Sequence, residues 1–463
     1  MYIPYPHWLN TGDNTWQIVS ATLVGLMSLP GIAVLYGGLV QRKWAVNTMM
    51  MAFTGFGLVL IVWILWAFNM SFGTPLHFGG SNPHAFLNNA LGHFKIATSP
   101  QAEQGQEILP EGTLIPFHYN QATFMYFQVV FAAITPLLFL GSVLGRMKFK
   151  AWLLFVPLWI TCVYSVNAFL LWGGGFFAQK GAVDYSGGYV IHLAAGVTGF
   201  VAAWVIGPRL ERDRKHGVPN NLLLVAVGAG ILWLGWNGFN GGDPFYAGVD
   251  ATSAVLNTNL CTAAAMMTWV FMDMFLAKEK KATFLGAING MIVGLVAITP
   301  GAGWVNGYGA LLEGLIASAI VWVAWYYLVK VKPFSKVDDA LGVVYTHGIA
   351  GLCGGLLVGF FGDPGMIEYI GKGSDAPGFA VQGLFYTGSW HQVWEQFLAA
   401  SWVIVFTAIA SFILLQIVKL LVGLRESDEK LEQGDLGIHG EEVYPEETFA
   451  ERVGSGSFEP ANA

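Results

Sequence analysis

The sequence predicts an all-α integral membrane protein, and two observations lead to that fold class. The chain has 463 residues, of which 55% are hydrophobic and only 11% are charged, and its mean hydropathy is +0.55. Ordinary soluble domains carry roughly 25% charged residues, so this chain has too little charge to cover a globular surface in water. Long apolar runs also recur along the chain, each near the ~20 residues that cross a hydrocarbon core.

The apolar runs number eleven, and each is expected to form one transmembrane helix. They cover residues 16–40, 45–72, 118–143, 151–172, 186–207, 221–240, 252–276, 282–299, 305–330, 341–362 and 391–423. The chain opens without the positive region and small-residue cleavage site of a secretory signal, so the first run is expected to be a permanent helix. Residues 1–423 therefore form the predicted transmembrane domain. Residues 424–463 form a polar, acidic tail, expected to be poorly ordered after Tyr444.

Lysine and arginine residues predict the orientation of the chain. Their clusters lie in alternate connections, at residues 42–43, 146–150, 208–215, 278–281 and 330–336. The other connections hold only Lys95, Lys180 and Lys372. Because cationic loops stay in the cytoplasm, the N-terminus is expected outside and the C-terminus inside. Loops 73–117 and 363–390 are then external.

Charge and cysteine content bear on nucleic-acid binding, disulfide formation and metal binding. The net charge of −7 arises mostly from the tail and the outer loops and gives no support for nucleic-acid binding. Cys162, Cys261 and Cys353 all fall in apolar runs without CxxC spacing. They are interpreted as small core residues rather than as a disulfide or a metal site.

The fifth and tenth runs share a pattern that predicts an internal repeat. After both His192 and His347 the chain has Ala at +3 and Gly at +4, +7 and +15. Helices five spans apart run in opposite directions, which is typical of an inverted-topology repeat with its substrate site near the membrane midplane. Repeat one is predicted at about 16–207 and repeat two at about 221–362, with 391–423 as an extra helix.

The two histidines are candidate functional residues because polar groups in a membrane interior are costly and usually face a cavity or one another. His192 lies about six residues into a helix entering from outside, and His347 about six residues into one entering from the cytoplasm. Neutral imidazoles have one donor and one acceptor nitrogen, so the pair can bond to each other and line a conduit. The alternative is two unrelated core histidines bonded to backbone carbonyls.

Asp184 stands at the predicted outer start of the fifth helix. An aspartate in that position is first of all a helix cap, which the helix dipole also favours. Direct contact with a substrate is the alternative.

Several motifs together resemble one family. They are "PGIAVLYGGLV" (30–40), "DYSGGYVIHLAAG" (184–196), "GWNGFNGG" (235–242), "DDALGVVYTHGIAG" (338–351) and "GDLGIHGEEVY" in the tail. The sequence is similar to the ammonium transporter family (Amt/MEP, related to the Rh proteins) over essentially the whole chain. The resemblance implies a homotrimer in which each subunit carries its own narrow hydrophobic pore.

The resemblance also assigns roles to individual residues. The pore histidines of the family match His192 and His347, and the external site that recruits ammonium matches Phe131 and Trp172. The two stacked phenylalanines that close the pore match Phe127 or Phe131 and Phe239, with Trp236 packing nearby. The residues matching the cytoplasmic pore exit are Ile32, Leu35, Tyr36 and Val343.

One position departs from the family pattern. Where "GWFGFNAGS" is usual, this chain reads "GWNGFNGGDP", so Asp243 stands where the recruitment-site serine is expected. We hypothesise that Asp243 belongs to the external ion site, where a carboxylate holds a cation more tightly than a hydroxyl does. The alternative is a cap or turn at Pro244.

Elementary energetics agree with the implied mechanism. An aromatic face attracts a cation by about 0.5–2 kcal/mol, which recruits ammonium without trapping it. A bare ion in a dry channel faces a Born cost of tens of kcal/mol. The ion must therefore lose its proton, which either stays outside or travels separately along the histidine pair. The residues alone leave open whether net charge moves.

The predicted substrates are ammonium, ammonia and methylammonium, and the predicted location is a prokaryotic plasma membrane. No enzyme activity, cofactor or metal is expected. The tail segment 424–444 resembles the family segment that packs under neighbouring subunits, and the resemblance implies a PII-type signalling protein as a partner at the cytoplasmic face. Three alternatives stay open: an ammonium sensor without transport, a membrane haem electron-transfer subunit with His192 and His347 as axial ligands, and a Rh-like carrier of carbon dioxide.

Overall fold

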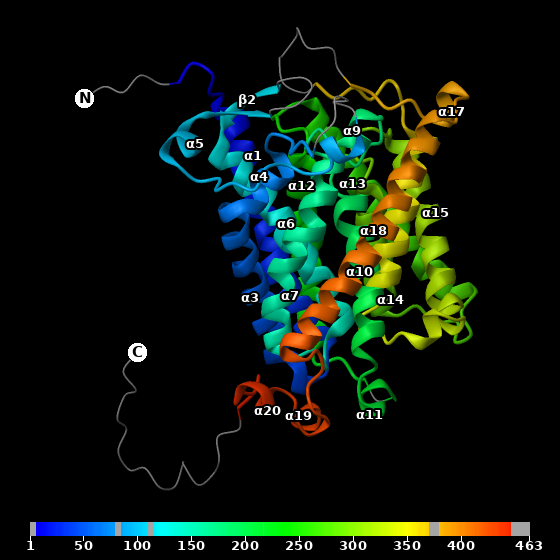
Figure 1. The fold of residues 1–463 in the computed structure, drawn as a ribbon. Helices are drawn as coiled ribbons and strands as arrows, with labels where there is room; N and C mark the ends of the chain where they lie inside the picture. Colours follow the sequence, from blue (N-terminus) through cyan, green and yellow to red (C-terminus); the bar gives the residue numbers. More distant parts are fainter. Residues whose placement is uncertain (1–5, 79–84, 110–114, 216, 370–378, 446–463) are drawn as a thin grey trace, which may run out of the picture.

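The computed structural model describes residues 6–78, 85–109, 115–215, 217–369 and 379–445. Long helices run side by side between two ends of the molecule (Figure 1). One end carries the short strands β1 (Gln106–Leu109) and β2 (Ile115–Asn120), and we call it the hairpin end. The other carries the helices of the tail, and we call it the tail end.

The first half of the chain contains more separate helical elements than the number of transmembrane helices predicted for it. Its helices in chain order are α1 (Thr11–Leu26), η1 (Met27–Gly31), α2 (Ile32–Leu39), η2 (Arg42–Trp44), α3 (Ala45–Val62), η3 (Trp63–Ala67), α4 (Phe68–Phe72), η4 (Phe86–Asn89), α5 (Pro100–Gln104), α6 (Gln121–Val143), α7 (Phe149–Trp159), η5 (Ile160–Tyr164), α8 (Ser165–Leu171), α9 (Phe176–Gln179), η6 (Gly188–Leu193) and α10 (Ala194–Ile206). Of these, η1, η3, η5 and η6 are π-helical turns; the first three continue the helix on either side, whereas η6 opens the helix that α10 continues.

The second half of the chain likewise contains more helical elements than predicted transmembrane helices. Its helices are α11 (Glu211–Lys215), α12 (Leu222–Gly242), α13 (Val249–Phe275), α14 (Phe284–Ile298), α15 (Gly307–Tyr326), η7 (Leu328–Lys330), η8 (Phe334–Lys336), η9 (Val344–Ile349), α16 (Ala350–Phe361), α17 (Leu384–Thr387), α18 (His391–Val422), α19 (Asp428–Gln433) and α20 (Asp435–His439). The π-helical turn η9 opens the helix that α16 continues.

Within the described ranges, ten helical segments are long and apolar enough to cross a membrane. They coincide with ten of the predicted runs to within a few residues. The remaining run, predicted at 282–299, is the shorter apolar helix α14, which has 15 residues. At 1.5 Å per residue this helix is about 22 Å long, less than the ~30 Å of a hydrocarbon core. The ends of α14 lie within two residues of the predicted run, and a full span there stays a prediction.

The π-helical turns mark places where the ordinary helix ladder is disturbed. Pro30 lies inside η1, where its missing N–H removes a ladder bond. Pro157 lies in the last turn of α7, just before η5. The other two turns of interest, η6 and η9, carry His192 and His347. Single π-helical turns inside α-helices occur frequently at functional sites.

Small residues let the segments η6–α10 and η9–α16 cross in backbone contact. A Cβ added to Gly196 would lie 2.2 Å from the Cα of Gly348, and one added to Gly351 would lie 2.5 Å from the carbonyl oxygen of Gly188. No side chain fits in either place, so glycine is required by close approach. The crossing brings the two π-helical turns together in the interior of the bundle.

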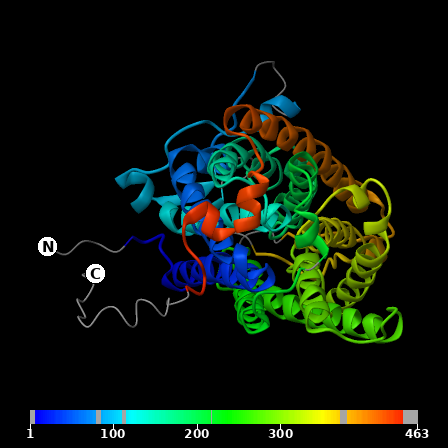
Figure 2. The ribbon, with the colours of Figure 1, turned by 90° about the horizontal axis from the view of Figure 1, so that it is seen from below.

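The tail returns to its own subunit at the tail end. The Asp435 carboxylate accepts hydrogen bonds from the amides of Val46 and Asn47, each at 2.8 Å, and so caps the first turn of α3. His439 bonds the Asn47 side chain at 2.9 Å. Seen from below, the tail helices lie across the ends of other helices (Figure 2). The segment expected to pack under neighbouring subunits thus packs against its own chain. The disorder expected after Tyr444 concerns residues that lie almost wholly outside the described ranges.

The cysteines differ in their surroundings. Cys261 is buried and Cys353 is partly buried, whereas Cys162 is exposed on the outside of the bundle. The interpretation of all three as core residues was wrong for Cys162, because the face of its helix that carries it points away from the other helices.

Candidate functional site

His192 and His347 face each other in the interior of the bundle. Their Nδ1 atoms lie 3.2 Å apart, and their ring planes are 20° from parallel with centroids 5.3 Å apart. His192 is 0% and His347 5% exposed. Since a hydrogen bond needs one donor and one acceptor, only one of the two facing nitrogens carries a proton when both rings are neutral. The Nε2 atom of His192 is buried and has no hydrogen-bond partner in the described part of the chain.

Carboxylates fix the start of both π-helical turns. The Asp184 carboxylate accepts hydrogen bonds from the amides of Tyr189 at 3.0 Å and Val190 at 2.9 Å. On the opposite side of the crossing, the Asp339 carboxylate accepts one from the amide of Val344 at 2.8 Å. Each carboxylate thereby satisfies amides that a helix start leaves without a partner.

The two halves match in sequence register as well as in contacts. Asp184 stands eight residues before His192, and Asp339 stands eight residues before His347. Five residues before each histidine lies a glycine with positive φ, Gly187 at 108° and Gly342 at 77°, a conformation that side chains rarely adopt. Sequence reasoning missed the second aspartate, although the shared D-x2-G-x4-H spacing signals it.

An aromatic pair lies between the histidines and the hairpin end. The rings of Phe131 and Phe239 stack with centroids 4.3 Å apart at 14°. Phe127 contacts Phe131 at 4.8 Å in a tilted arrangement. Of the two alternatives for the stacked partner of Phe239, the structure therefore has Phe131, which Phe127 also contacts. Phe239 in turn lies 6.1 Å from the ring of His192.

Trp236 packs against the imidazole of His192. Its ring stacks on His192 with centroids 5.3 Å apart at 15°, and its Nε1 donates to the Thr299 hydroxyl at 2.9 Å. Trp236 covers one face of the His192 imidazole and His347 contacts its Nδ1 edge, so the ring is held in place.

Two of the residues expected to recruit a cation, Trp172 and Asp243, lie on the hairpin side of the Phe131–Phe239 pair. Trp172 meets Phe131 edge to face at 6.3 Å and donates its Nε1 to the carbonyl of Asp184 at 2.5 Å. The carboxylate of Asp243, the residue after α12, accepts a hydrogen bond from the Ser186 hydroxyl. Asp243 therefore links the end of α12 to the segment that precedes η6.

Charge and burial act against each other at Asp243. Burial raises the pKa of its carboxyl well above the usual range, the Ser186 hydrogen bond lowers it, and the charges of Asp184 and Glu368 raise it further. Burial dominates, because a charged carboxylate loses more hydration than one hydroxyl restores. Without a cation beside it, the neutral acid is favoured.

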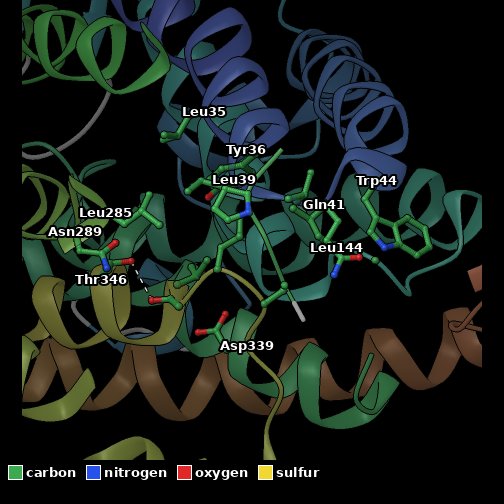
Figure 3. A pocket seen from close by; sticks show the side chains of 18 of the residues that line it. Leu35, Tyr36, Leu39, Gln41, Trp44, Leu144, Leu285, Asn289, Asp339 and Thr346 are labelled. Atoms are coloured by element: carbon green, nitrogen blue, oxygen red, sulfur yellow. Dashed lines mark hydrogen bonds between the residues drawn. The ribbon is translucent and has the colours of Figure 1, made fainter. Parts of the chain in front are cut away.

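A cavity of about 370 Å³ opens from His347 toward the tail end. His347 and Asp339 line it, together with three of the residues expected at the pore exit, Leu35, Tyr36 and Val343. Figure 3 shows the Leu35 and Tyr36 side chains and the Asp339 carboxylate around this space. Ile32, the fourth expected exit residue, is buried on α2 and is not among the residues that line this cavity, so its place at the pore exit stays a prediction.

Arg209, which lines the cavity, belongs to a charged network that sequence reasoning missed. Asp338 receives two side-chain hydrogen bonds from Arg209, at 2.7 and 3.0 Å. Burial alone raises the pKa of Asp338, but these bonds and the charge of Arg146 outweigh it and lower the pKa to about 2. Arg146 is 1% exposed and donates to three backbone carbonyls, those of Leu144, Gly207 and Asp338.

The geometry does not suit haem. Axial imidazoles bind iron from opposite faces through bonds of about 2.0 Å, so their ligating nitrogens lie about 4 Å apart across the macrocycle. The facing nitrogens of His192 and His347 are only 3.2 Å apart. Within the described residues no group of three or more His, Cys, Asp and Glu side chains could hold a metal ion.

Comparison with known families agrees with this geometry. The model of the Ammonium Transporter Family matches residues 15–444, nearly the whole chain. The chain belongs to the ammonium transporter family. Members of this family are transporters and channels rather than enzymes.

Curated relatives and solved structures place the chain within the ammonium transporter family at different distances. It is 46% identical to Ammonium transporter 3 member 2 of Oryza sativa over 441 residues, covering 94% of this chain and 90% of that protein. It is 43% identical to Ammonium transporter 2 of Arabidopsis thaliana over 442 residues, covering 95% and 89%. The crystal structure of Saccharomyces cerevisiae Mep2 is similar with a TM-score of 0.76 at 26% identity, covering 91% of this chain and 89% of that one.

Proposed function

We propose that this member of the ammonium transporter family takes up ammonium at the hairpin end and conducts ammonia to the tail end, with the proton following along the histidine pair. One observation carries the proposal: the rings of Phe127, Phe131, Phe239, His192 and His347 form an unbroken series of contacts that ends in the cavity. Methylammonium is the expected second substrate.

The proposed orientation places the hairpin end outside. The tail end carries the cationic residues of three connections, Arg42 and Lys43, Arg146 and Lys148, and Arg209 to Lys215. Cationic connections favour the cytoplasmic side. We propose eleven spans with α14 as the shortest, N-terminus outside and C-terminus inside, arranged as two inverted repeats plus α18, in a plasma membrane.

Recruitment follows from cation–π attraction and hydrogen bonding. We propose that Phe131 and Trp172 attract ammonium, and that Asp243 supplies an acceptor oxygen. Potassium ions are attracted by the same rings but cannot donate hydrogen bonds. The combination therefore selects ammonium over cations of similar charge and size.

Deprotonation follows from the dryness of the passage. Phe131 and Phe239 are fully buried and stack at 4.3 Å, which leaves no room for a hydrated ion between them. A bare cation would lose its hydration with no compensating charge, so ammonia crosses as the neutral molecule. His192 Nε2 is free to accept a proton, and the Nδ1 contact to His347 continues the relay toward the cavity.

The deciding experiment measures uptake and current on the same proteoliposomes. We expect radiolabelled methylammonium uptake together with a transient inward current after an ammonium pulse. Uptake without current would overturn the proton relay and leave the ammonia path standing. Folded protein that supports neither uptake nor current would overturn the proposed function.

Assembly and regulation are proposed from the family resemblance. We propose a homotrimer, to be checked by the mass of the detergent-solubilised protein. We further propose that a PII-type protein binds the tail end, where the cavity opens and the tail docks through Asp435. Co-purification with such a protein from cells is the corresponding measurement.

A further inference from the structure

Phe245 has an unusual backbone. Its φ is 65°, and within the described ranges the only other non-glycine residue with a positive φ is Lys280. A bulky residue in the left-handed region is uncommon and costs conformational energy, so it persists only where the surroundings hold it there. Phe245 lies two residues after Asp243, in the turn that connects α12 to α13.

Neighbouring aromatic rings and a backbone hydrogen bond hold this turn in place. The Phe245 ring lies 5.2 Å from Phe117 and 5.6 Å from Phe124, at 61° to each. The amide of Phe245 donates to the carbonyl of Gly242 at 3.0 Å. The strained conformation is therefore fixed by contacts from β2 and α6, two elements distant in sequence.

Asp13 ties the same turn to β2. Its carboxylate accepts a hydrogen bond from the amide of Ala247 at 2.9 Å and contacts His118 Nδ1 at 3.1 Å. The ring of His118 packs edge to face on Tyr246 at 5.1 Å. These contacts leave the turn little freedom to move the Phe245 ring elsewhere.

The Phe245 ring extends the aromatic path outward. It lies 6.0 Å from Phe127 at 82°, and Phe127 in turn contacts Phe131 at 4.8 Å. Phe127, Phe131 and Phe239 are all fully buried, whereas Phe245 is only partly buried. An incoming cation at the hairpin end thus meets the Phe245 ring before the others.

Acidic groups surround this part of the hairpin end. Phe117, which contacts Phe245, stacks on Tyr119 at 5.3 Å and 6°. The groups that raise the pKa of Tyr119 well above its usual range, after burial, are Tyr246, Glu107, Asp13 and Asp243. Three carboxyl groups are therefore close enough to act electrostatically on the aromatic cluster. Burial raises the pKa of Glu107 to about 8 and that of Asp243 well above its usual range, so a cation at the outer ring favours the ionised forms of both.

We propose that Phe245 is the outermost cation-binding ring of the ammonium path and forms, with Phe127, an entry site for ammonium and methylammonium outside the Phe131–Phe239 pair. This inference rests on the proposed function. Rings at nearly right angles form a corner in which a cation meets the electron-rich face of one of them. The backbone strain at Phe245 is explained by this role, because it places the ring beside Phe127.

The test compares three variants for methylammonium uptake. Phe245→Leu keeps the volume and the backbone strain but removes the π face, and we expect the half-saturation concentration to rise about three- to tenfold. Phe245→Tyr keeps the face and is the matched control, expected within about twofold of the wild type. Phe245→Gly removes both ring and strain; it is expected to lose the same affinity and serves if Phe245→Leu does not fold.

Two results would overturn the inference. One is an unchanged half-saturation concentration in folded Phe245→Leu or Phe245→Gly protein. The other is an equal loss in Phe245→Tyr and Phe245→Leu, which would assign the ring a packing role only. Both results presuppose a wild type that transports methylammonium, so they are distinguishable from failure of the proposed function, in which the wild type itself shows no uptake.

Discussion

His192 and His347 meet through like atoms, Nδ1 to Nδ1, at 3.2 Å. Two protons do not fit between these nitrogens, so the contact holds one proton at most. A proton that enters at His192 Nε2 must be matched by one that leaves the His347 ring on the cavity side, where His347 lines the open space. The contact between the two nitrogens is itself symmetric, so the side from which the proton arrives sets the direction of transfer.

Replacing either imidazole is expected to abolish the relay. For His192→Ala and His347→Ala we expect the ammonium-induced current to fall by at least about tenfold, because a positioned proton donor and acceptor is lost. The matched control is His93→Ala, since His93 is an exposed histidine at the hairpin end. Currents are compared per folded protein in proteoliposomes; wild-type current in both pore variants would contradict a relay.

Asp184 is expected to act by positioning His192. Asp184→Ala removes the acceptor for the Tyr189 and Val190 amides and should abolish transport, whereas the side-chain oxygen of Asp184→Asn can still accept from them and should preserve part of it. Uptake and thermal stability are measured together. Equal loss in the two variants would count against a purely structural role.

Asp243 predicts a pH dependence of substrate affinity. Burial raises the pKa of Asp243, so the empty site holds a proton, and an arriving cation favours the carboxylate and expels that proton. Affinity must therefore increase as the external pH rises. We expect the half-saturation concentration for methylammonium to fall by up to about tenfold per pH unit.

The control for that titration replaces the carboxyl. Asp243→Ser and Asp243→Asn cannot ionise at this position, so their half-saturation concentration should be flat over the same pH range. A wild-type profile as flat as theirs would remove Asp243 from the ion site.

The crossing of the two histidine-bearing segments is expected to tolerate no side chain. Gly196→Ala would put a methyl group 2.2 Å from the Cα of Gly348 and should prevent assembly of the native protein. Gly57 and Gly230 also lie in apolar helices, but nothing lies within 4 Å of a Cβ added there. Gly57→Ala and Gly230→Ala should therefore give wild-type elution in size-exclusion chromatography, which is the measurement for all three.

Much of this architecture could be predicted from the sequence, because the positions of the helices and the internal repeat both leave a clear pattern in a membrane protein. Hydropathy over ~20 residues locates helices, since every backbone group must be satisfied within the segment. The shared spacing around His192 and His347 predicted that they belong together, because a repeat carries position as well as composition. Even so, α14 is shorter than its apolar run suggested, because residues around Thr299 form turns instead of helix.

Features that depend on contacts between distant segments could not be predicted in the same way. Whether Phe127 or Phe131 stacks on Phe239 is decided by the rotation of α6. The burial of Arg146 was hidden within an ordinary cationic cluster. The left-handed backbone of Phe245 has no local signal at all, since glycine or asparagine would be expected in that conformation.

The wide turn η6 carries His192 at its end, and the amide of His192 reaches back five residues to the carbonyl of Gly187 at 3.0 Å. Removing one residue from this turn would restore an ordinary ladder and swing the imidazole by ~100° relative to the preceding chain. The series of ring contacts from Phe127 to His347 would then be interrupted at the position of His192. A single-codon deletion here is thus more damaging than most substitutions, since it alters the phase of the helix while leaving its chemistry intact.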